Sequence, residues 1–291
     1  MAQPPIHTQI TPRTKLDFGL DGDIPKYWLG GDPFRTRFID GLSMTFPVGE
    51  RFFIDSVRRF RDQIQDPQLK QEVRDFMLQE GQHGMVHNQW NARLREQGVP
   101  VDAAEAFCQK FFDWQFRWLP KTWPLAHTAA VEHMTALMAE ALFGQESFFE
   151  GADERMRAVF TWHAIEEFEH KAVAFDVLTK VAKASYFTRV GVMLCSVTMF
   201  QLFTLNFVRH ILKGDGFNWK ERLRIWGSGL WWLYKPRGGL FTRMLPSILM
   251  YLKPGFHPSD IHEPEVYRTW NAAFASTQDP LEASRATLQA A

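Results

Sequence analysis

The sequence has only two cysteines, no net charge and no strand-like alternation, and each shortage excludes a class of protein. Cys108 and Cys195 lie far apart and outside any CxxC pattern, which excludes a disulfide framework and a thiolate metal site and fits a reducing, cytoplasmic compartment. The 33 basic residues balance the 33 acidic ones, so no overall positive field favours nucleic acid. There is also no Gly-rich phosphate loop and no GxSxG elbow.

The N-terminus lacks the apolar core of a secretory signal and the pattern of an amphipathic transit helix. Its first 20 residues carry Pro4, Pro5 and mixed polar residues, and we expect them to form a flexible arm. The following segment to Ser43 is rich in Gly, Pro and Asp and predicts an irregular, packed lead-in. Residues 1–45 therefore form the first predicted region.

Apolar residues are abundant: 45% of the 291 residues are hydrophobic and 14% are aromatic, which is enough for a sizeable core. Their spacing predicts an all-α fold. The expected helices run from Pro47 to about Ile64, from Pro67 to about Gln97, from Phe107 to Trp118, from about Trp123 to Glu150 and from Met156 to Val181. The Phe107 to Trp118 helix is expected to be the long crossover connection between the two helical hairpins of a four-helix bundle spanning residues 46–183.

Two of these helices carry acidic and histidine residues on their inward faces. In the Pro67 to Gln97 helix, apolar residues recur at alternating intervals of four and three and form a seam along one face of the helix. Glu80 and His83 lie on this seam. The Met156 to Val181 helix has the same repeat with His163, Glu167 and His170 on it. Glu50 and Glu132 lie on the inward faces of the other two main helices, and Glu132 has small neighbours that leave room for an ion.

This pattern indicates a dinuclear metal centre. One Glu from each of two helices plus a Glu-x-x-His from each of the others is the ligand set of di-iron and di-manganese carboxylate proteins. Four carboxylates also balance two divalent cations, which keeps the bundle interior close to neutral. The alternative is a polar bundle core without metal, but two Glu-x-x-His pairs on heptad seams are hard to explain by packing alone.

Residues 50–170 resemble the ferritin-like di-iron oxygenases. The spacing His163-x3-Glu167-x2-His170 is similar to that of the p-aminobenzoate N-oxygenase group, which adds a third His ligand one turn before the last Glu-x-x-His pair. By this resemblance the metal ligands are Glu50, Glu80, His83, Glu132, His163, Glu167 and His170, with no further catalytic residue. Without it, His163 could equally hydrogen-bond Glu167, four residues on along the same face.

The chain as a whole resembles a second family, of bacterial proteins classed as predicted metal-dependent hydrolases. Three stretches carry this resemblance: Phe46-Pro47-x-Gly49-Glu50, Trp162-His163-x-x-Glu166-Glu167 and Pro254-Gly255-Phe256-His257-Pro258. Two functions follow. The first is a non-haem di-iron oxygenase or oxidase, with two Fe ions or Mn, that uses O2 on a small hydrophobic or amine substrate and receives electrons from a reductase or ferredoxin. The alternative is a dinuclear metal-dependent hydrolase. We favour oxidation, because a helix-buried cage of Glu and His suits redox iron.

His87 and Glu166 lie beside the predicted ligands. His87 shares the face of Glu80 and His83 but lies seven residues beyond Glu80, so we expect it to support a ligand or contact substrate, with direct ligation as the alternative. Glu166 lies about 100° off the seam, which predicts a surface position or a supporting contact.

The last region, residues 184–291, is predicted to be an apolar helical extension and tail. Val190 to Val208 carry no charge and are just long enough to cross a bilayer, although polar residues such as Gln201 and Asn206 weaken that interpretation. Our first interpretation is a buried helix that covers the bundle. The Trp, Lys and Arg residues that follow also favour a contact surface at 186–252, peripheral to the metal bundle, for a membrane, a hydrophobic substrate or a homodimer partner.

Overall fold

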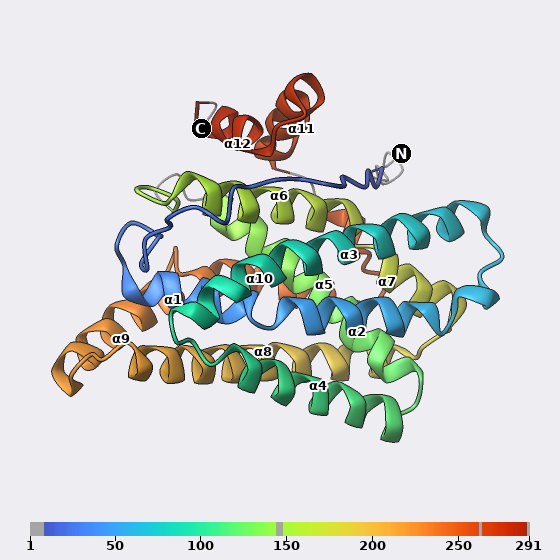
Figure 1. Cartoon of the computed structure of the whole chain (residues 1–291). Helices are drawn as coiled ribbons and strands as arrows, with labels where there is room; N and C mark the ends of the chain where they lie inside the picture. The colour runs from blue at the N-terminus through green and yellow to red at the C-terminus, as the bar shows by residue number, and fades with distance from the viewer. Residues whose placement is uncertain (1–8, 144–147, 262–263, 290–291) are drawn as a thin grey trace.

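The described structure is almost entirely helical. It is a computed structural model that describes residues 9–143, 148–261 and 264–289 (Figure 1). Within these ranges the extended contact is a single isolated bridge between Leu29 and Ala152. The predicted all-α helical bundle is therefore confirmed.

Four helices surround the centre of the molecule. They are α2 (Phe46–Arg58), α3 (Pro67–Glu96), α5 (Thr122–Phe143) and α6 (Glu154–His170), and α4 (Val101–Trp118) connects α3 to α5 (Figure 1). Local sequence fixes where they start. The Asp66 side chain accepts a hydrogen bond from the Gln68 backbone N–H ahead of Pro67, and Asp153 does the same for Arg155 at the start of α6.

Several predicted helix limits are wrong. The predicted irregular lead-in ends in a helix, α1 (Pro33–Ser43), whose start is capped by the Asp32 side chain. The first bundle helix ends at Arg58 and gives way to a short 3₁₀ turn, Arg61–Gln63. The crossover helix begins at Val101 and not near Phe107. The last part of the predicted Trp123 to Glu150 helix is a turn at 148–151, and residues 144–147 lie outside the described ranges.

The predicted continuous helix from Met156 to Val181 is interrupted. α6 ends at His170, a turn follows, and the chain continues as α7 (Val173–Asp176) and a π-helical segment, Val177–Val181. At the break, the buried Lys171 side chain donates a hydrogen bond to the Ile261 carbonyl, 2.6 Å away. This contact comes from a distant segment of the chain, and the heptad pattern carries no information about it.

The predicted flexible arm packs against the bundle at several positions from residue 9 onward, between residues that stay exposed. Phe18 is buried and its ring lies 5.3 Å from that of Trp162 on α6. Arg13 is also buried, and it forms ion pairs with α6. The N-terminal segment runs alongside α6 (Figure 1), so its described part belongs to the fold and is not a free arm.

The C-terminal region surrounds the bundle. It comprises α8 (Tyr186–Gly214), α9 (Trp219–Tyr234), α10 (Leu240–Tyr251), a 3₁₀ turn (Pro258–Asp260), α11 (Glu265–Thr277) and α12 (Pro280–Gln289). α8 packs along α5 and α1, while α12 packs on α6. Within the described ranges α8 is the helix long and apolar enough to cross a membrane, but only 28% of its most apolar stretch is buried. The helix therefore covers the bundle as predicted, but the prediction that it is buried is wrong.

Candidate metal centre

The predicted ligand side chains lie together inside the bundle, and all of them are buried. They are Glu50 from α2, Glu80 and His83 from α3, Glu132 from α5, and His163, Glu167 and His170 from α6. Their donor atoms form two overlapping groups, each with all its atoms within 4.8 Å of one another: the first holds Glu80, His83, Glu167 and His170, and the second holds Glu50, His83 and His163. Glu132 joins the first group through His170, whose Nδ1 lies 2.7 Å from Glu132 Oε2.

Many of these donor atoms have no hydrogen-bond partner. Both carboxylate oxygens of Glu50 and of Glu80 lack one, as do Glu132 Oε1, His83 Nδ1 and His170 Nε2. Unpaired polar atoms in a protein interior are costly, and native structures contain few of them. Oxygen and imidazole nitrogen donors that converge without partners are what divalent transition metals bind. The residues present therefore fit a metal centre, although the role of each one as a ligand stays a prediction.

Three carboxyl groups of the cluster have pKa values above their ordinary range. Burial, and then the charges of Glu167 and Glu132, raise the pKa of Glu50 well above its ordinary value. Burial and the surrounding carboxylates raise the pKa of Glu80 in the same way. Burial also raises the pKa of Glu132 to about 7, against the lowering effect of His170. Crowded carboxylates that resist ionisation gain most from positive charge placed between them.

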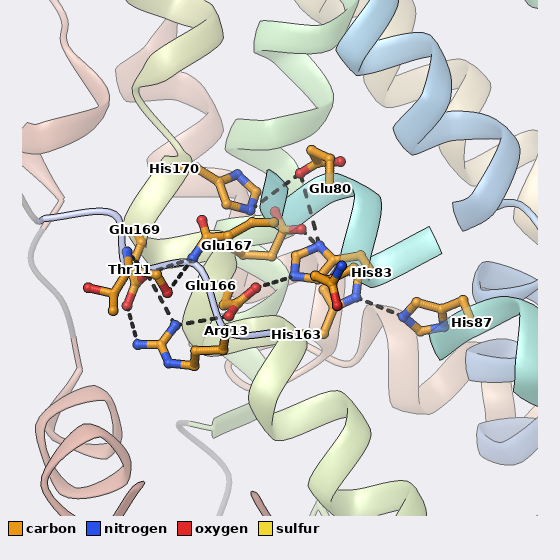
Figure 2. Close-up of polar contacts among 12 residues, drawn as sticks. Thr11, Arg13, Glu80, His83, His87, His163, Glu166, Glu167, Glu169 and His170 are labelled. Carbon is orange, nitrogen blue, oxygen red and sulfur yellow. Dashed lines mark hydrogen bonds and ion pairs between the residues drawn. The ribbon is translucent and has the colours of Figure 1, made fainter. Parts of the chain in front are cut away.

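Figure 2 shows how His83 is held. Its Nε2 lies 3.0 Å from Glu166 Oε2, whereas Nδ1 faces Glu80, 4.0 Å from Oε1. A contact at one ring nitrogen sets which nitrogen is left for a metal, so Glu166 presents Nδ1 to the cluster. Glu166 is fully buried, and burial raises its pKa to about 8 while the nearby Arg13 acts to lower it. A surface position for Glu166 is therefore wrong, and the supporting contact is the arrangement observed.

Sequence reasoning missed the polar group behind Glu166. Arg13 Nη1 lies 3.0 Å from Glu166 Oε1, and Nη2 lies 2.7 Å from Glu169 Oε1 (Figure 2). Glu169 also accepts hydrogen bonds from the Thr11 backbone N–H and from Gln79 Nε2, at 2.9 and 2.7 Å. No signal in the sequence pointed to Arg13, because it lies in a proline-containing segment without periodicity.

His87 lies behind His163 and is buried. Its Nε2 is 2.8 Å from His163 Nδ1, and its Nδ1 is 2.9 Å from Ser43 Oγ. His163 Nε2 in turn lies 2.9 Å from Glu167 Oε1. The hydrogen bond between His163 and Glu167, which the sequence offered as the alternative to metal ligation by His163, is therefore present. His87 supports His163, and metal ligation by His163 stays a prediction.

Two apolar cavities lie against the centre. One has a volume of about 100 Å³ and the other of about 40 Å³, and Phe46, Thr135, His163 and Glu167 line both. Phe200, Phe203 and Phe207 of α8 form part of the larger cavity. Because α8 encloses space that touches the predicted ligands, the expectation that the region 186–252 is peripheral to the bundle is wrong for this helix.

Comparison with known protein families identifies the chain's family. The sequence model of a family described as predicted metal-dependent hydrolases matches residues 12–262. The chain belongs to this family. The match confirms the resemblance seen in the sequence for the chain as a whole, and it leaves the resemblance to oxygenases as a prediction. No curated protein and no solved structure gave a significant match. Family and site together support a metal-dependent enzyme with a buried Glu/His cluster.

Proposed function

We propose that the protein binds two transition-metal ions, with iron as the productive metal, and oxidises a small, largely apolar molecule with O2. The observation that carries this proposal is the convergence of unpaired Glu and His donors beside apolar cavities. Glu50, Glu80, His83, Glu132, His163, Glu167 and His170 would hold the ions. Bound there, two ions would supply either a redox pair for O2 or Lewis acidity for hydrolysis.

The residues around the cluster favour an apolar substrate. The larger cavity is walled by aromatic rings from α2, α4 and α8, including Phe53, Phe112 and Phe203. Burial lowers the pKa of His127, on the same wall, to about 4, so this imidazole is neutral at pH 7. The chain's own contribution is to exclude water, orient an apolar molecule and keep the donor atoms in place. Electrons would come from a reductase or ferredoxin.

Metal-assisted hydrolysis is the second candidate, and the family description is the finding that favours it. The two candidates differ in what the metal must do, because hydrolysis needs no change of oxidation state. Protein loaded with Zn²⁺ should therefore keep a hydrolase activity and lose an oxidase activity.

The deciding experiment loads the metal-free protein with Fe²⁺ or Zn²⁺ in parallel. Each form is tested for O2 consumption in the presence of a chemical reductant and for cleavage of a panel of apolar ester and amide substrates. We expect the Fe²⁺ form alone to consume O2. Ester or amide cleavage by both forms, without O2 consumption by either, would overturn the oxidase proposal and establish hydrolysis.

A further inference from the structure

An outward stripe of α8 is apolar along most of its length and basic at its end. Phe187, Leu194 and Leu202 are 83%, 50% and 57% exposed, and Arg209 and Lys213 continue the stripe at spacings of seven and four residues. Such large apolar side chains in a row are unusual for a surface that faces only water. The stripe therefore indicates a contact surface.

The basic end of this stripe meets the outward side of α9. Arg209 and Lys213 line a surface groove together with Trp219 and Leu223. Trp219 and Leu223 are 65% and 68% exposed, and Leu230, two turns further on, is 40% exposed. We call the combined surface the α8–α9 face, and it consists of Phe187, Leu194, Leu202, Arg209, Lys213, Trp219, Leu223 and Leu230. In Figure 1, α8 and α9 lie along one edge of the molecule, opposite α11 and α12.

The charge balance of this region is one-sided. From residue 186 to 251 there are nine Arg and Lys residues and two acidic ones, Asp215 and Glu221. Asp215 has a largely buried side chain and is ion-paired with Arg37 and Lys26. Glu221 accepts a hydrogen bond from the Asn218 backbone N–H at the start of α9. The face is thus apolar and cationic, a combination that complements an anionic lipid surface.

The opposite side of α8 excludes a spanning arrangement. Val192, Met193 and Val208 are buried against the bundle, and α8 makes its contacts with α5 and α1 along that side. A helix that crosses a bilayer alone would need apolar surface on all sides. Only one side of α8 is available, which fits a helix that lies in the plane of the interface.

We propose that the α8–α9 face docks this protein onto the surface of an anionic lipid bilayer. Trp219, Leu223 and the apolar stripe of α8 enter the headgroup region, while Arg209 and Lys213 pair with lipid phosphates. The docking does not depend on which reaction the metal centre catalyses. It places the aromatic cavity, one wall of which is the inner side of α8, one helix away from lipid.

The test is vesicle flotation of the full chain. Vesicles of phosphatidylcholine alone are compared with vesicles that contain phosphatidylglycerol as well, at low and at raised salt. The variant Arg209→Glu/Lys213→Glu reverses two exposed charges on the face. The matched control, Lys70→Glu/Arg268→Glu, reverses two exposed basic residues on α3 and α11. Circular dichroism and thermal melts check that both variants fold.

We expect the wild type and the control to float with the anionic vesicles, more at low salt than at high salt. Because each basic residue near an anionic surface contributes about fivefold to the partition coefficient, the face variant should bind at least about 25-fold more weakly. The variant Trp219→Ser/Leu223→Ser should also lose binding while the salt dependence remains.

Three results would overturn the proposal. The first is no flotation of the wild type with anionic vesicles at low salt. The second is equal binding by the face variant and its control. The third is a dimer in light scattering that the Trp219→Ser/Leu223→Ser variant dissociates, without vesicle binding, since a second copy of the chain would then cover the face.

Discussion

Replacing Glu80 with Gln should change the stability of the metal-free and the metal-loaded protein in opposite directions. Both Glu80 oxygens are buried and without a hydrogen-bond partner, and burial and neighbouring carboxylates raise its pKa well above the ordinary value. The amide has nearly the same volume, so the substitution removes mainly the charge. A carboxyl group with a raised pKa must take up a proton when the chain folds at neutral pH, and the amide avoids this cost. We expect the metal-free variant to be more stable than the metal-free wild type by on the order of 1 kcal/mol.

The same change should remove most of the stabilisation by metal. A ligand at 100 times its dissociation constant stabilises a protein by about 2.7 kcal/mol, and in a chain of this size 1 kcal/mol corresponds to roughly 2 °C in Tm. The wild type should therefore gain about 5 °C or more on addition of Fe²⁺ or Mn²⁺ under anaerobic conditions. The Glu80→Gln variant should gain much less, because the amide carries no negative charge and its oxygen is a weaker donor than a carboxylate oxygen.

Differential scanning calorimetry gives the Tm of the wild type and of the Glu80→Gln variant, each with and without metal. Glu72→Gln is the matched control, since Glu72 is a half-buried carboxylate on the same helix α3 and lies outside the cluster. The control should leave both the metal-free Tm and the gain on metal addition unchanged. A metal-free Glu80→Gln protein that is less stable than the wild type, or a gain with metal equal to that of the wild type, would refute the reasoning.

Three further predictions test the surroundings of the centre. His163→Ala should retain the fold and at least one ion per chain by elemental analysis but lose O2 consumption, and unchanged consumption would argue against His163 as a ligand. Arg13→Met should lower the free energy of unfolding in urea by about 3–5 kcal/mol, because two buried carboxylates lose their partner, whereas the exposed Arg61→Met should change it little. Phe203→Trp should reduce binding of a benzene-sized probe, measured by NMR, because the larger ring fills the cavity, and it should leave the metal content unchanged. Unchanged probe binding would show that this cavity is not where an apolar molecule binds.

The helical bundle and its cluster of Glu and His could be predicted because both depend on local spacing. Residues three and four apart share one side of a helix, so the placement of Glu80 with His83 and of Glu167 with His170 follows from the sequence alone. The same reasoning predicts that each pair faces the interior, since apolar residues continue each seam.

Other features depend on contacts between distant segments, and the sequence could not show them. Arg13 reaches Glu166 and Glu169 across more than 150 residues, and no periodicity signals such a pair. The break after His170 accompanies the contact of Lys171 with Ile261. The exposure of α8 was also hidden, because an uncharged run predicts burial in protein and contact with lipid equally well.

The most direct test of the central claim is the metal content of protein that has been produced in iron-supplemented cells and purified anaerobically. Elemental analysis should find two transition-metal ions per chain in the wild type and fewer in the Glu80→Gln and Glu167→Gln variants. A well-folded wild-type protein with one ion or none would contradict the account.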